Sequence, residues 1–183
     1  MLELATLGFL QKQPLHGYRL KQQLELFMSG CISVNYGAIY PLLKRLEARG
    51  DIVTLVEETG ESGSGRKEYC ITDAGRDRWR QKMLEYPHES WVNSRSRFII
   101  KYFFFSHLHP TERVKLLEQR LLVCRSRLQD LEREDIAGSG DRYEATAWRR
   151  HLSNLRFEID WLVEQLEQEK VESNRLQEVG IRD

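Results

Sequence analysis

Apolar residues recur three or four positions apart along several segments of the chain, a spacing that predicts helices with one buried face. The most informative of these segments is residues 34–50. Its apolar face consists of Ile39, Leu42, Leu43 and Leu46. Its opposite face carries Gly37, Tyr40 and Lys44 at the same helical spacing. We therefore expect a short helix that buries one side and presents a phenol and an amine to a partner.

Pro41 lies within this predicted helix. A proline removes one backbone hydrogen bond and crowds the carbonyl four residues earlier, which here belongs to Gly37. Because a glycine can yield to that crowding, we expect a tolerated kink and not the end of the helix. The turn before the helix offers Ser33 or Asn35 as the capping residue.

Two shorter helices are predicted before this segment. The first spans the apolar residues between Leu2 and Leu10, and it ends before Pro14 and Gly17, which favour a turn. The second runs from Tyr18 to Phe27, with Leu20, Leu24 and Phe27 on its inner side.

A β-hairpin is predicted after the third helix. Residues 52–58 and 66–72 are the strands, and the Gly-rich stretch 60–65 is the tip. Apolar residues alternate along the two strands at Val53, Leu55, Tyr69 and Ile71. Another helix follows and reaches about Tyr86. Helices followed by a hairpin with a basic pair, Arg66 and Lys67, are typical of a winged helix-turn-helix that binds DNA.

Two regular heptad runs occupy the second half of the chain. Their apolar positions are Val114, Leu117, Leu121, Cys124, Leu128 and Leu131, and then Trp148, Leu152, Leu155, Ile159, Leu162 and Leu166. The Gly-rich residues 138–141 between the runs predict an antiparallel helical hairpin. Because further apolar residues lie beside the seam, we expect the helices to pack across a two-fold axis as a homodimer. The alternative is a monomeric helical tail that packs on its own first domain.

The predicted fold is therefore mainly α. A winged helix-turn-helix domain with a two-stranded β wing covers residues 1–86, a junction or hinge helix covers 87–110, and an α-helical dimerisation hairpin covers 111–175. The residues predicted to form the dimer seam are Leu117, Leu121, Leu128, Leu152, Leu155, Ile159 and Leu162.

Charge neither supports nor excludes DNA binding. The chain has 28 Lys and Arg against 28 Asp and Glu, and its net charge is zero. Bulk charge therefore counts against a nucleic-acid partner. Phosphate contacts need only a local basic cluster, however, and a dimer would double any such cluster.

Other classes of protein receive little support. No apolar run has membrane-spanning length, and the start lacks the basic and apolar regions of a secretion signal. Three distant cysteines suggest free thiols in a reducing cytoplasm, so we expect a cytoplasmic, nucleoid-associated protein. His107 and His109 lack a third metal ligand at suitable spacing. Without a phosphate loop, nucleophile elbow or paired carboxylates, we expect no enzyme, no metal and no cofactor.

Three motifs in the first 85 residues resemble the PadR-type transcriptional regulators. They are His16-Gly17-Tyr18 with Leu20; Gly37-Ala38-Ile39-Tyr40-Pro41-Leu42-Leu43 with Arg45-Leu46-Glu47 and Gly50; and Gly65-Arg66-Lys67 with Tyr69, Ile71-Thr72 and Gly75. The second half resembles the long-helix version of that family's dimerisation domain in pattern only. The resemblance implies a homodimeric winged helix, usually a repressor, often released by a small molecule.

The wing departs from the family pattern. Gly65 stands where the family commonly has a proline beside its basic residues, and Glu57, Glu58 and Glu61 make the tip less basic. We therefore expect a looser and less basic wing tip than the family pattern implies.

The residues predicted to contact DNA come from four places in the first domain. They are Tyr18, Asn35, Tyr36, Tyr40, Lys44, Arg66 and Lys67. Tyr40 and Lys44 are placed in the major groove, with Asn35 and Tyr36 near the entry end. Arg66 and Lys67 are expected on phosphates, and Tyr18 at a helix start is expected there too. The alternative for the tyrosines is core packing, and for the wing residues it is a solvated strand end.

An effector site is a further hypothesis from the aromatic residues near the junction. Flat apolar walls suit planar ligands, and the candidates are Trp91, Phe98, Tyr102 and Trp148. The alternative is that these aromatic side chains only fill the core.

The function predicted from these observations is a DNA-binding transcriptional regulator. We expect a homodimeric repressor on an inverted-repeat operator, and release by a small aromatic effector or a partner is a further hypothesis. Two alternatives are a winged-helix module that binds another protein, and a small-molecule sensor that does not touch DNA.

Overall fold

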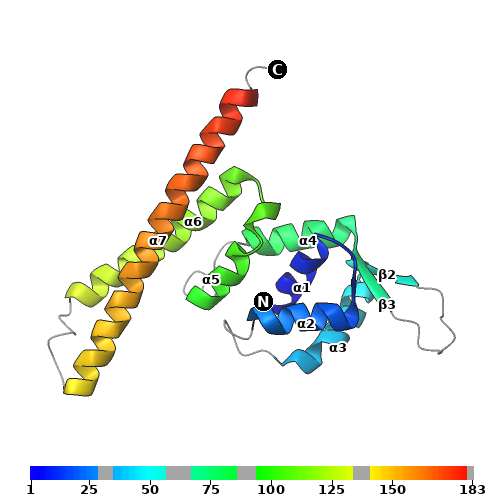
Figure 1. The fold of residues 1–183 in the computed structure, drawn as a ribbon, viewed down its shortest axis with the longest axis horizontal. Coiled ribbons are helices and arrows are strands. Elements are labelled where there is room, and N and C mark those ends of the chain that lie inside the picture. The colour runs from blue at the N-terminus through cyan, green and yellow to red at the C-terminus, as the bar shows by residue number, and fades with distance from the viewer. Residues whose placement is uncertain (29–34, 57–66, 86–93, 134–140, 181–183) are drawn as a thin grey trace. The chain divides into compact units, whose positions relative to one another are not determined.

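The computed structural model describes residues 1–28, 35–56, 67–85, 94–133 and 141–180. The chain divides into two compact units, Met1–His107 and Leu108–Asp183 (Figure 1). The predicted wing tip, the capping candidate Ser33 and the glycines of the predicted hairpin connection lie outside the described residues.

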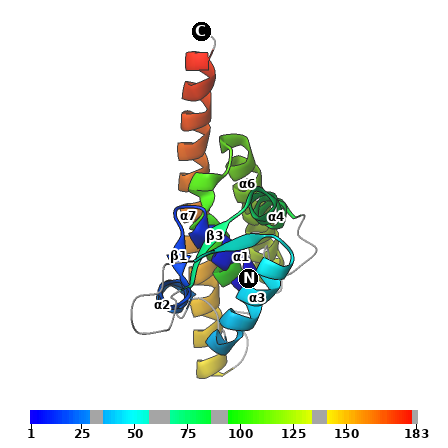
Figure 2. The same ribbon diagram turned by 90° about the vertical axis from the view of Figure 1, so that its right-hand side faces the viewer.

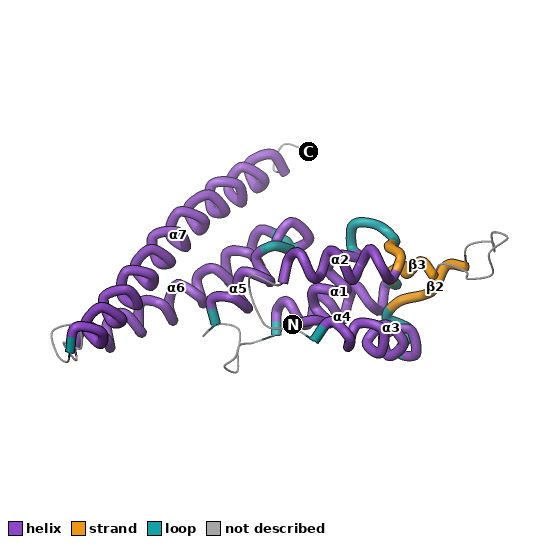
Figure 3. Tube along the Cα trace, turned by 60° about the horizontal axis from the view of Figure 1, so that its bottom comes forward, coloured by secondary structure: helices purple, strands orange, loops and turns teal. Residues whose placement is uncertain are grey.

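The first unit is mainly helical and contains one small sheet, whose strands are orange in Figure 3. Its elements in chain order are α1 (Leu2–Leu10), β1 (Leu15–His16), α2 (Gly17–Met28), the 3-10 turn η1 (Tyr36–Ala38), α3 (Ile39–Ala48), β2 (Ile52–Val56), β3 (Lys67–Ile71), α4 (Asp73–Leu84), α5 (Arg95–Tyr102) and the 3-10 turn η2 (Phe105–His107). This order confirms the predicted winged helix-turn-helix.

The sheet has three antiparallel strands in the order β1-β3-β2, one strand more than the sequence predicts. Strands β1 and β3 are labelled in Figure 2. Leu15 pairs with Tyr69, and Ile52 pairs with Ile71. The sequence places only a turn at β1, because two residues are too few to show an alternating pattern. Pairing with β3 ties the start of α2 to the wing.

The core of this unit lies between α1, α2, α3 and one face of the sheet. Its largest buried aliphatic side chains include Leu7, Leu10, Leu20, Leu24, Ile39, Leu43, Leu46 and Ile52. The predicted apolar face of α3 is confirmed, because all four of its members are buried. Strand β2 does not bury the apolar residues that alternate in its sequence. Ile52 is buried, whereas Val53 and Leu55 are exposed. Side chains alternate along a strand, so burying Ile52 turns its neighbours outward.

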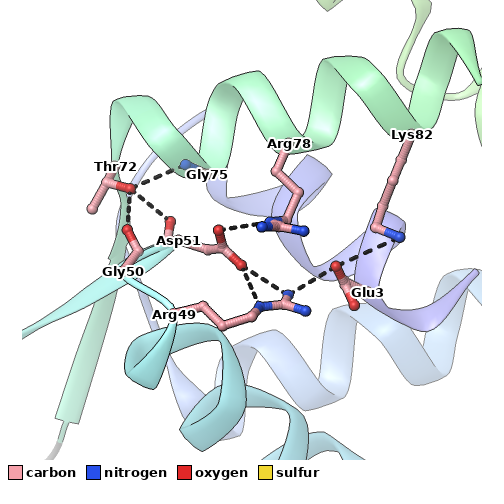
Figure 4. Close-up of polar contacts among 8 residues, drawn as sticks. All are labelled: Glu3, Arg49, Gly50, Asp51, Thr72, Gly75, Arg78 and Lys82. Carbon is pink, nitrogen blue, oxygen red and sulfur yellow. Dashed lines mark hydrogen bonds and ion pairs between the residues drawn. The ribbon is translucent and has the colours of Figure 1, made fainter.

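A buried carboxylate connects α3, β2 and α4 (Figure 4). Asp51 is 1% exposed, and its two oxygens accept hydrogen bonds from Arg49 Nε at 2.8 Å and Arg78 Nε at 2.9 Å. Arg49 also reaches Glu3 on α1 at 2.9 Å. Charged hydrogen bonds of this kind are stronger than neutral ones. This network therefore fixes the end of α3 relative to three other elements.

Thr72 and Gly75 complete the same junction (Figure 4). The Thr72 hydroxyl donates to the carbonyl of Gly50 at 2.6 Å, and it accepts the amide of Gly75 at 3.1 Å as the N-cap of α4. A Cβ atom at Gly75 would overlap the carbonyl oxygen of Asp51. Only glycine allows α4 to come this close to the backbone at the start of β2.

We expect Gly75→Ala to lower the free energy of unfolding by about 3 kcal/mol or more, because backbone atoms must move to accept the methyl group. Gly50→Ala is the matched control. Gly50 has φ +75° but open space around its Cα, so its cost should be only about 1 kcal/mol of backbone strain. Urea denaturation of both variants measures the difference, and equal losses would contradict the close approach.

Lys101 on α5 is a buried cation that caps α4. Its Nζ donates to the carbonyls of Lys82 and Met83, both at 2.9 Å, near the C-terminus of that helix. Burial lowers the pKa of Lys101 from 10.5 to about 8; the field of Glu85 raises it and that of Lys82 lowers it further. The carbonyls compensate only part of the cost of burying the charge.

This pKa predicts a stability that rises with pH. The folded lysine loses its proton near pH 8 and the unfolded one near 10.5, so the unfolded chain binds more protons between these values. Relative to Lys101→Met, the wild-type protein should gain about 2 kcal/mol of unfolding free energy between pH 7.5 and 9.5. Denaturant titrations at both pH values test this, and parallel changes in the two proteins would contradict it.

The second unit is an antiparallel pair of long helices, α6 (Pro110–Arg133) and α7 (Arg142–Gly180). The predicted helical hairpin is therefore confirmed in its two helices. Its inner face buries Leu117, Leu121 and Cys124 of α6 and Leu155, Leu162 and Leu166 of α7. Of the other predicted seam residues, Leu128, Leu152 and Ile159 are half-buried. Four of the seven predicted dimer residues are thus buried within one chain.

Ion pairs fix the register of the two helices. Arg120 and Glu158 form a buried pair, with hydrogen bonds of 3.0 and 2.6 Å to the same carboxylate oxygen. Arg113 lies 3.2 Å from Glu169 toward one end of the hairpin. A one-residue slip would leave the buried pair unsatisfied, which is far more costly than losing an exposed pair.

Candidate nucleic-acid interface

The outward face of α3 carries the side chains that the sequence assigns to DNA. Lys44 is exposed and Tyr40 is 48% exposed, although the apolar face of the same helix is fully covered. The two residues are four positions apart, so they lie one above the other on the helix. Pro41 is also exposed beside them.

The predicted kink at Pro41 is wrong. The α-helix begins at Ile39, so Pro41 lies in its first turn, where backbone amides have no partner within the helix. A proline is tolerated there because the amide that it lacks is not needed. The residues before it form the turn η1 instead of a further helical turn.

Asn35 acts as the cap of that turn. Its Oδ1 accepts the amide of Gly37 at 3.0 Å, and its carbonyl accepts the amide of Ala38 at 3.0 Å. Asn35 is exposed, but its side-chain oxygen is already hydrogen-bonded. Tyr36 lies in η1, and its side chain is outside the described part of the structure.

A groove of about 740 Å³ lies between α3, the start of α2 and strand β3. It is lined by His16, Gly17, Tyr18, Arg19, Tyr40, Lys44, Glu47, Lys67 and Tyr69. Four of the predicted DNA contacts, Tyr18, Tyr40, Lys44 and Lys67, are therefore brought together. Arg66 lies outside the described residues. His16, Arg19, Glu47 and Tyr69 also line the groove but are not among the predicted contacts.

Two tyrosine rings lie close to Gly17 in this groove. A Cβ atom at Gly17 would lie 3.2 Å from the Tyr69 ring and 3.3 Å from the Tyr40 ring. Tyr69 is buried, and burial raises the pKa of its phenol, with smaller contributions from Glu47 and Tyr40. Tyr40 thus packs through one part of its ring and remains half exposed. Packing against Gly17 is therefore observed for Tyr40, and its contact with DNA stays a prediction.

Three cations, Arg19, Lys44 and Lys67, line the groove together with the carboxylate of Glu47. Tyr18 and Arg19 are exposed in the first turn of α2, Lys44 is exposed on α3, and Lys67 is exposed at the start of β3. Side chains of this type at a helix start and a wing suit the phosphates on either side of a duplex groove. An exposed helix face next to an antiparallel wing, with cations between them, defines a winged-helix protein of the DNA-binding class.

Residues 6–81 match the model of the PadR-like family of transcriptional regulators. A second model, described as the virulence activator alpha C-terminus, matches residues 94–169. The curated negative transcriptional regulator PadR of Bacillus subtilis (strain 168) is 28% identical over 158 residues, covering 86% of this chain and 82% of that protein. The resemblance found in the sequence is confirmed, and the protein is a transcription regulator and not an enzyme.

Several solved structures are similar to the chain. The crystal structure of Bacillus subtilis PadR in complex with operator DNA is 24% identical with a TM-score of 0.44, covering 92% of this chain and 98% of that one. The structure of the same protein in complex with p-coumaric acid is 23% identical with a TM-score of 0.43, covering 92% of this chain and 98% of that one. The structure of smu.1604c from Streptococcus mutans UA159 is 21% identical with a TM-score of 0.45, covering 90% of this chain and 98% of that one.

The predicted effector residues fall in different units. Phe98 is fully buried and Tyr102 is half-buried in the first unit, and their rings lie 6.4 Å apart. Trp148 is half-buried on α7 in the second unit, and Trp91 lies outside the described residues. The complete burial of Phe98 favours packing for that residue.

Neither a metal site nor a membrane segment is found in the described part of the chain. No cluster of three or more His, Cys, Asp or Glu is arranged there to hold a metal ion. The described helices also include none that is long and apolar enough to cross a membrane.

Proposed function

We propose that this protein is a homodimeric repressor that binds an inverted-repeat operator through α3. The observation that carries the proposal is the exposed Tyr40–Lys44 face of α3 beside a groove lined by cations. An α-helix fits the major groove, where lysine can take guanine or a phosphate. The first turn of α2 and Lys67 would grip the backbone on either side and fix the orientation of the helix. Such a protein works at chromosomal DNA in the cytoplasm.

Repression follows from the kind of site that a dimer covers. Two α3 helices about 34 Å apart would enter successive major grooves on one side of the duplex. A dimer bound across a promoter excludes other proteins from it. The curated relative in Bacillus subtilis carries the name negative transcriptional regulator, in agreement with this direction of control.

The outer surface of α7 is the part of the hairpin that we assign to the second copy. Tyr143, Phe157 and Val171 are 80%, 65% and 69% exposed. They lie fourteen residues apart, which places them on one side of the helix along most of its length. Exposed apolar stripes of this kind mark protein interfaces. The half-buried Leu128, Leu152 and Ile159 add apolar surface to the hairpin.

A small aromatic effector completes the proposal. Tyr102 lies 4.9 Å from Phe105, ring centre to ring centre, and offers a partly open aromatic surface on α5. Such surfaces suit planar ligands. Trp91 and Trp148 remain candidates for the same role. Bacillus subtilis PadR has been crystallised with p-coumaric acid, a compound of this chemical type.

DNA binding can be tested with the duplex upstream of the protein's own gene and with sequences selected from random DNA. Lys44→Ala should weaken specific binding about ten-fold and reduce the slope of log K against log salt by about one. Tyr40→Phe keeps the ring over Gly17 and tests the hydroxyl alone. Lys115→Ala, an exposed lysine on α6, is the control for lost charge. Binding no tighter than to random DNA, with little salt dependence, would contradict the proposal and favour a protein-interaction module.

The dimer surface is tested by placing a charge on the α7 stripe. Phe157→Glu should convert the dimer to a monomer in sedimentation equilibrium and weaken operator binding, because a charge in an apolar interface is left unpaired. Arg149→Glu, at an exposed position about a quarter of a turn around α7 from the stripe, should leave the mass unchanged. A Phe157→Glu protein that remains dimeric would show that the copies meet elsewhere.

A further inference from the structure

Glu47 is the acidic side chain in a groove whose other charged residues are cations. It lies seven residues after Tyr40 and three after Lys44, so it continues their stripe along the outward face of α3. It lines the same groove as Arg19, Lys44 and Lys67. A carboxylate at this place repels phosphate and lowers affinity for any DNA. A residue that opposes general affinity needs another explanation.

The carboxylate is held in one position by the wing. Thr54 Oγ1 on β2 donates to Glu47 Oε1 at 2.5 Å, and Thr54 pairs across the sheet with Tyr69. Glu47 is half-buried and also contributes to the raised pKa of Tyr69, as expected for a group near that phenol. In the described part of the chain Glu47 makes no ion pair, although Lys44 lies one turn away. A carboxylate accepts about four hydrogen bonds, so it retains capacity for further donors.

The base edges of the major groove offer few donors to such an acceptor. Guanine presents two acceptors and thymine presents one with a methyl group, whereas cytosine presents its N4 amino group and adenine its N6 amino group. Adenine also places the N7 acceptor beside that amino group, where it would face the carboxylate. Cytosine is therefore the base that this side chain fits best.

We propose that Glu47 is a specificity-determining residue that accepts a hydrogen bond from a cytosine N4 amino group and rejects guanine and thymine at that position. The proposal rests on the proposed function, because it needs α3 in the major groove. Lys44, one turn earlier, attracts DNA of any sequence. Glu47 lowers the affinity for sites that lack cytosine at its position. Thr54 is a positioning residue that keeps the carboxylate aimed along the groove.

A purely structural role is the competing explanation. In that case Glu47 would only join α3 to β2 through Thr54. Glu47→Gln separates the two, because a glutamine carbonyl can still accept from Thr54 while its amide adds a donor. Glutamine pairs with the N6 and N7 edge of adenine. The variant should therefore change the preferred base and keep the fold.

The experiment is a selection of operators from random duplexes by the full-length wild-type protein and by Glu47→Gln. Titrations on duplexes that differ at one base pair then follow. The wild type should prefer cytosine at one position of each half-site by about ten-fold. Glu47→Gln should lose that preference or favour adenine, and it should bind random DNA a few-fold more tightly at low salt.

Thr54→Val is the second variant, which keeps the carboxylate but removes its anchor. It should reduce the cytosine preference less than Glu47→Gln does, with the salt slope unchanged. Melting curves establish that each variant is folded. If Glu47→Gln unfolds, Glu47→Asp withdraws the carboxylate by one methylene and should lower the cytosine preference in the same titration.

Two kinds of failure are distinguishable. A wild-type protein that enriches no sequence contradicts the proposed function itself. A wild-type protein that binds a defined operator, and whose Glu47 variants select the same bases with the same ratios, overturns only the role of Glu47. In that second case the hydrogen bond to Thr54 is a structural link between α3 and the wing.

Discussion

The buried carboxylate of Asp51 is the interaction on which the geometry of the DNA-binding unit depends. It lies where α3 ends and β2 begins, and the two arginines that it binds come from the end of α3 and from α4. A buried charge is tolerated only when its hydrogen bonds are satisfied. Moving one of these elements would break a hydrogen bond to the buried carboxylate and cost a large amount of folding free energy. The angle between the recognition helix and the wing is thereby fixed. Gly75 allows this arrangement by letting α4 approach the Asp51 carbonyl.

The groove beside α3 shows how affinity and specificity can be assigned to different residues. In the proposed complex, cations at the first turn of α2, on α3 and on β3 attract the phosphates of any duplex. The ring of Tyr40 lies close to Gly17, and packing of this kind reduces the side-chain entropy that is lost on binding. Zero net charge is compatible with this arrangement, since the field that a duplex meets comes from this one side of the domain.

The hairpin separates internal packing from surface that is left for a partner. Its heptad seam is largely used inside one chain, with Arg120 and Glu158 fixing the register. Residues of α7 that point away from α6 include aromatic and aliphatic side chains at heptad multiples. Apolar side chains on a water-exposed helix face contribute no burial energy, which is why we propose that a second copy covers them.

The sequence by itself determined the order of the helices and of the two wing strands, the buried face of α3, the helical hairpin and the resemblance to the PadR-like family, because hydrophobic periodicity and local motifs record these features directly. Sequence motifs also indicated Tyr18, Tyr40, Lys44 and Lys67, which share one groove in the structure. The tertiary structure decided what depends on residues distant in sequence. These features are the third strand β1, the exposure of Val53 and Leu55, and the position of Pro41 in the first turn of α3. They also include the burial of most heptad residues between α6 and α7 of one chain. Glu47 could have been found from its spacing with Tyr40 and Lys44. Its fixed orientation depends on the hydrogen bond from Thr54, which only the folding of β2 beside α3 brings there.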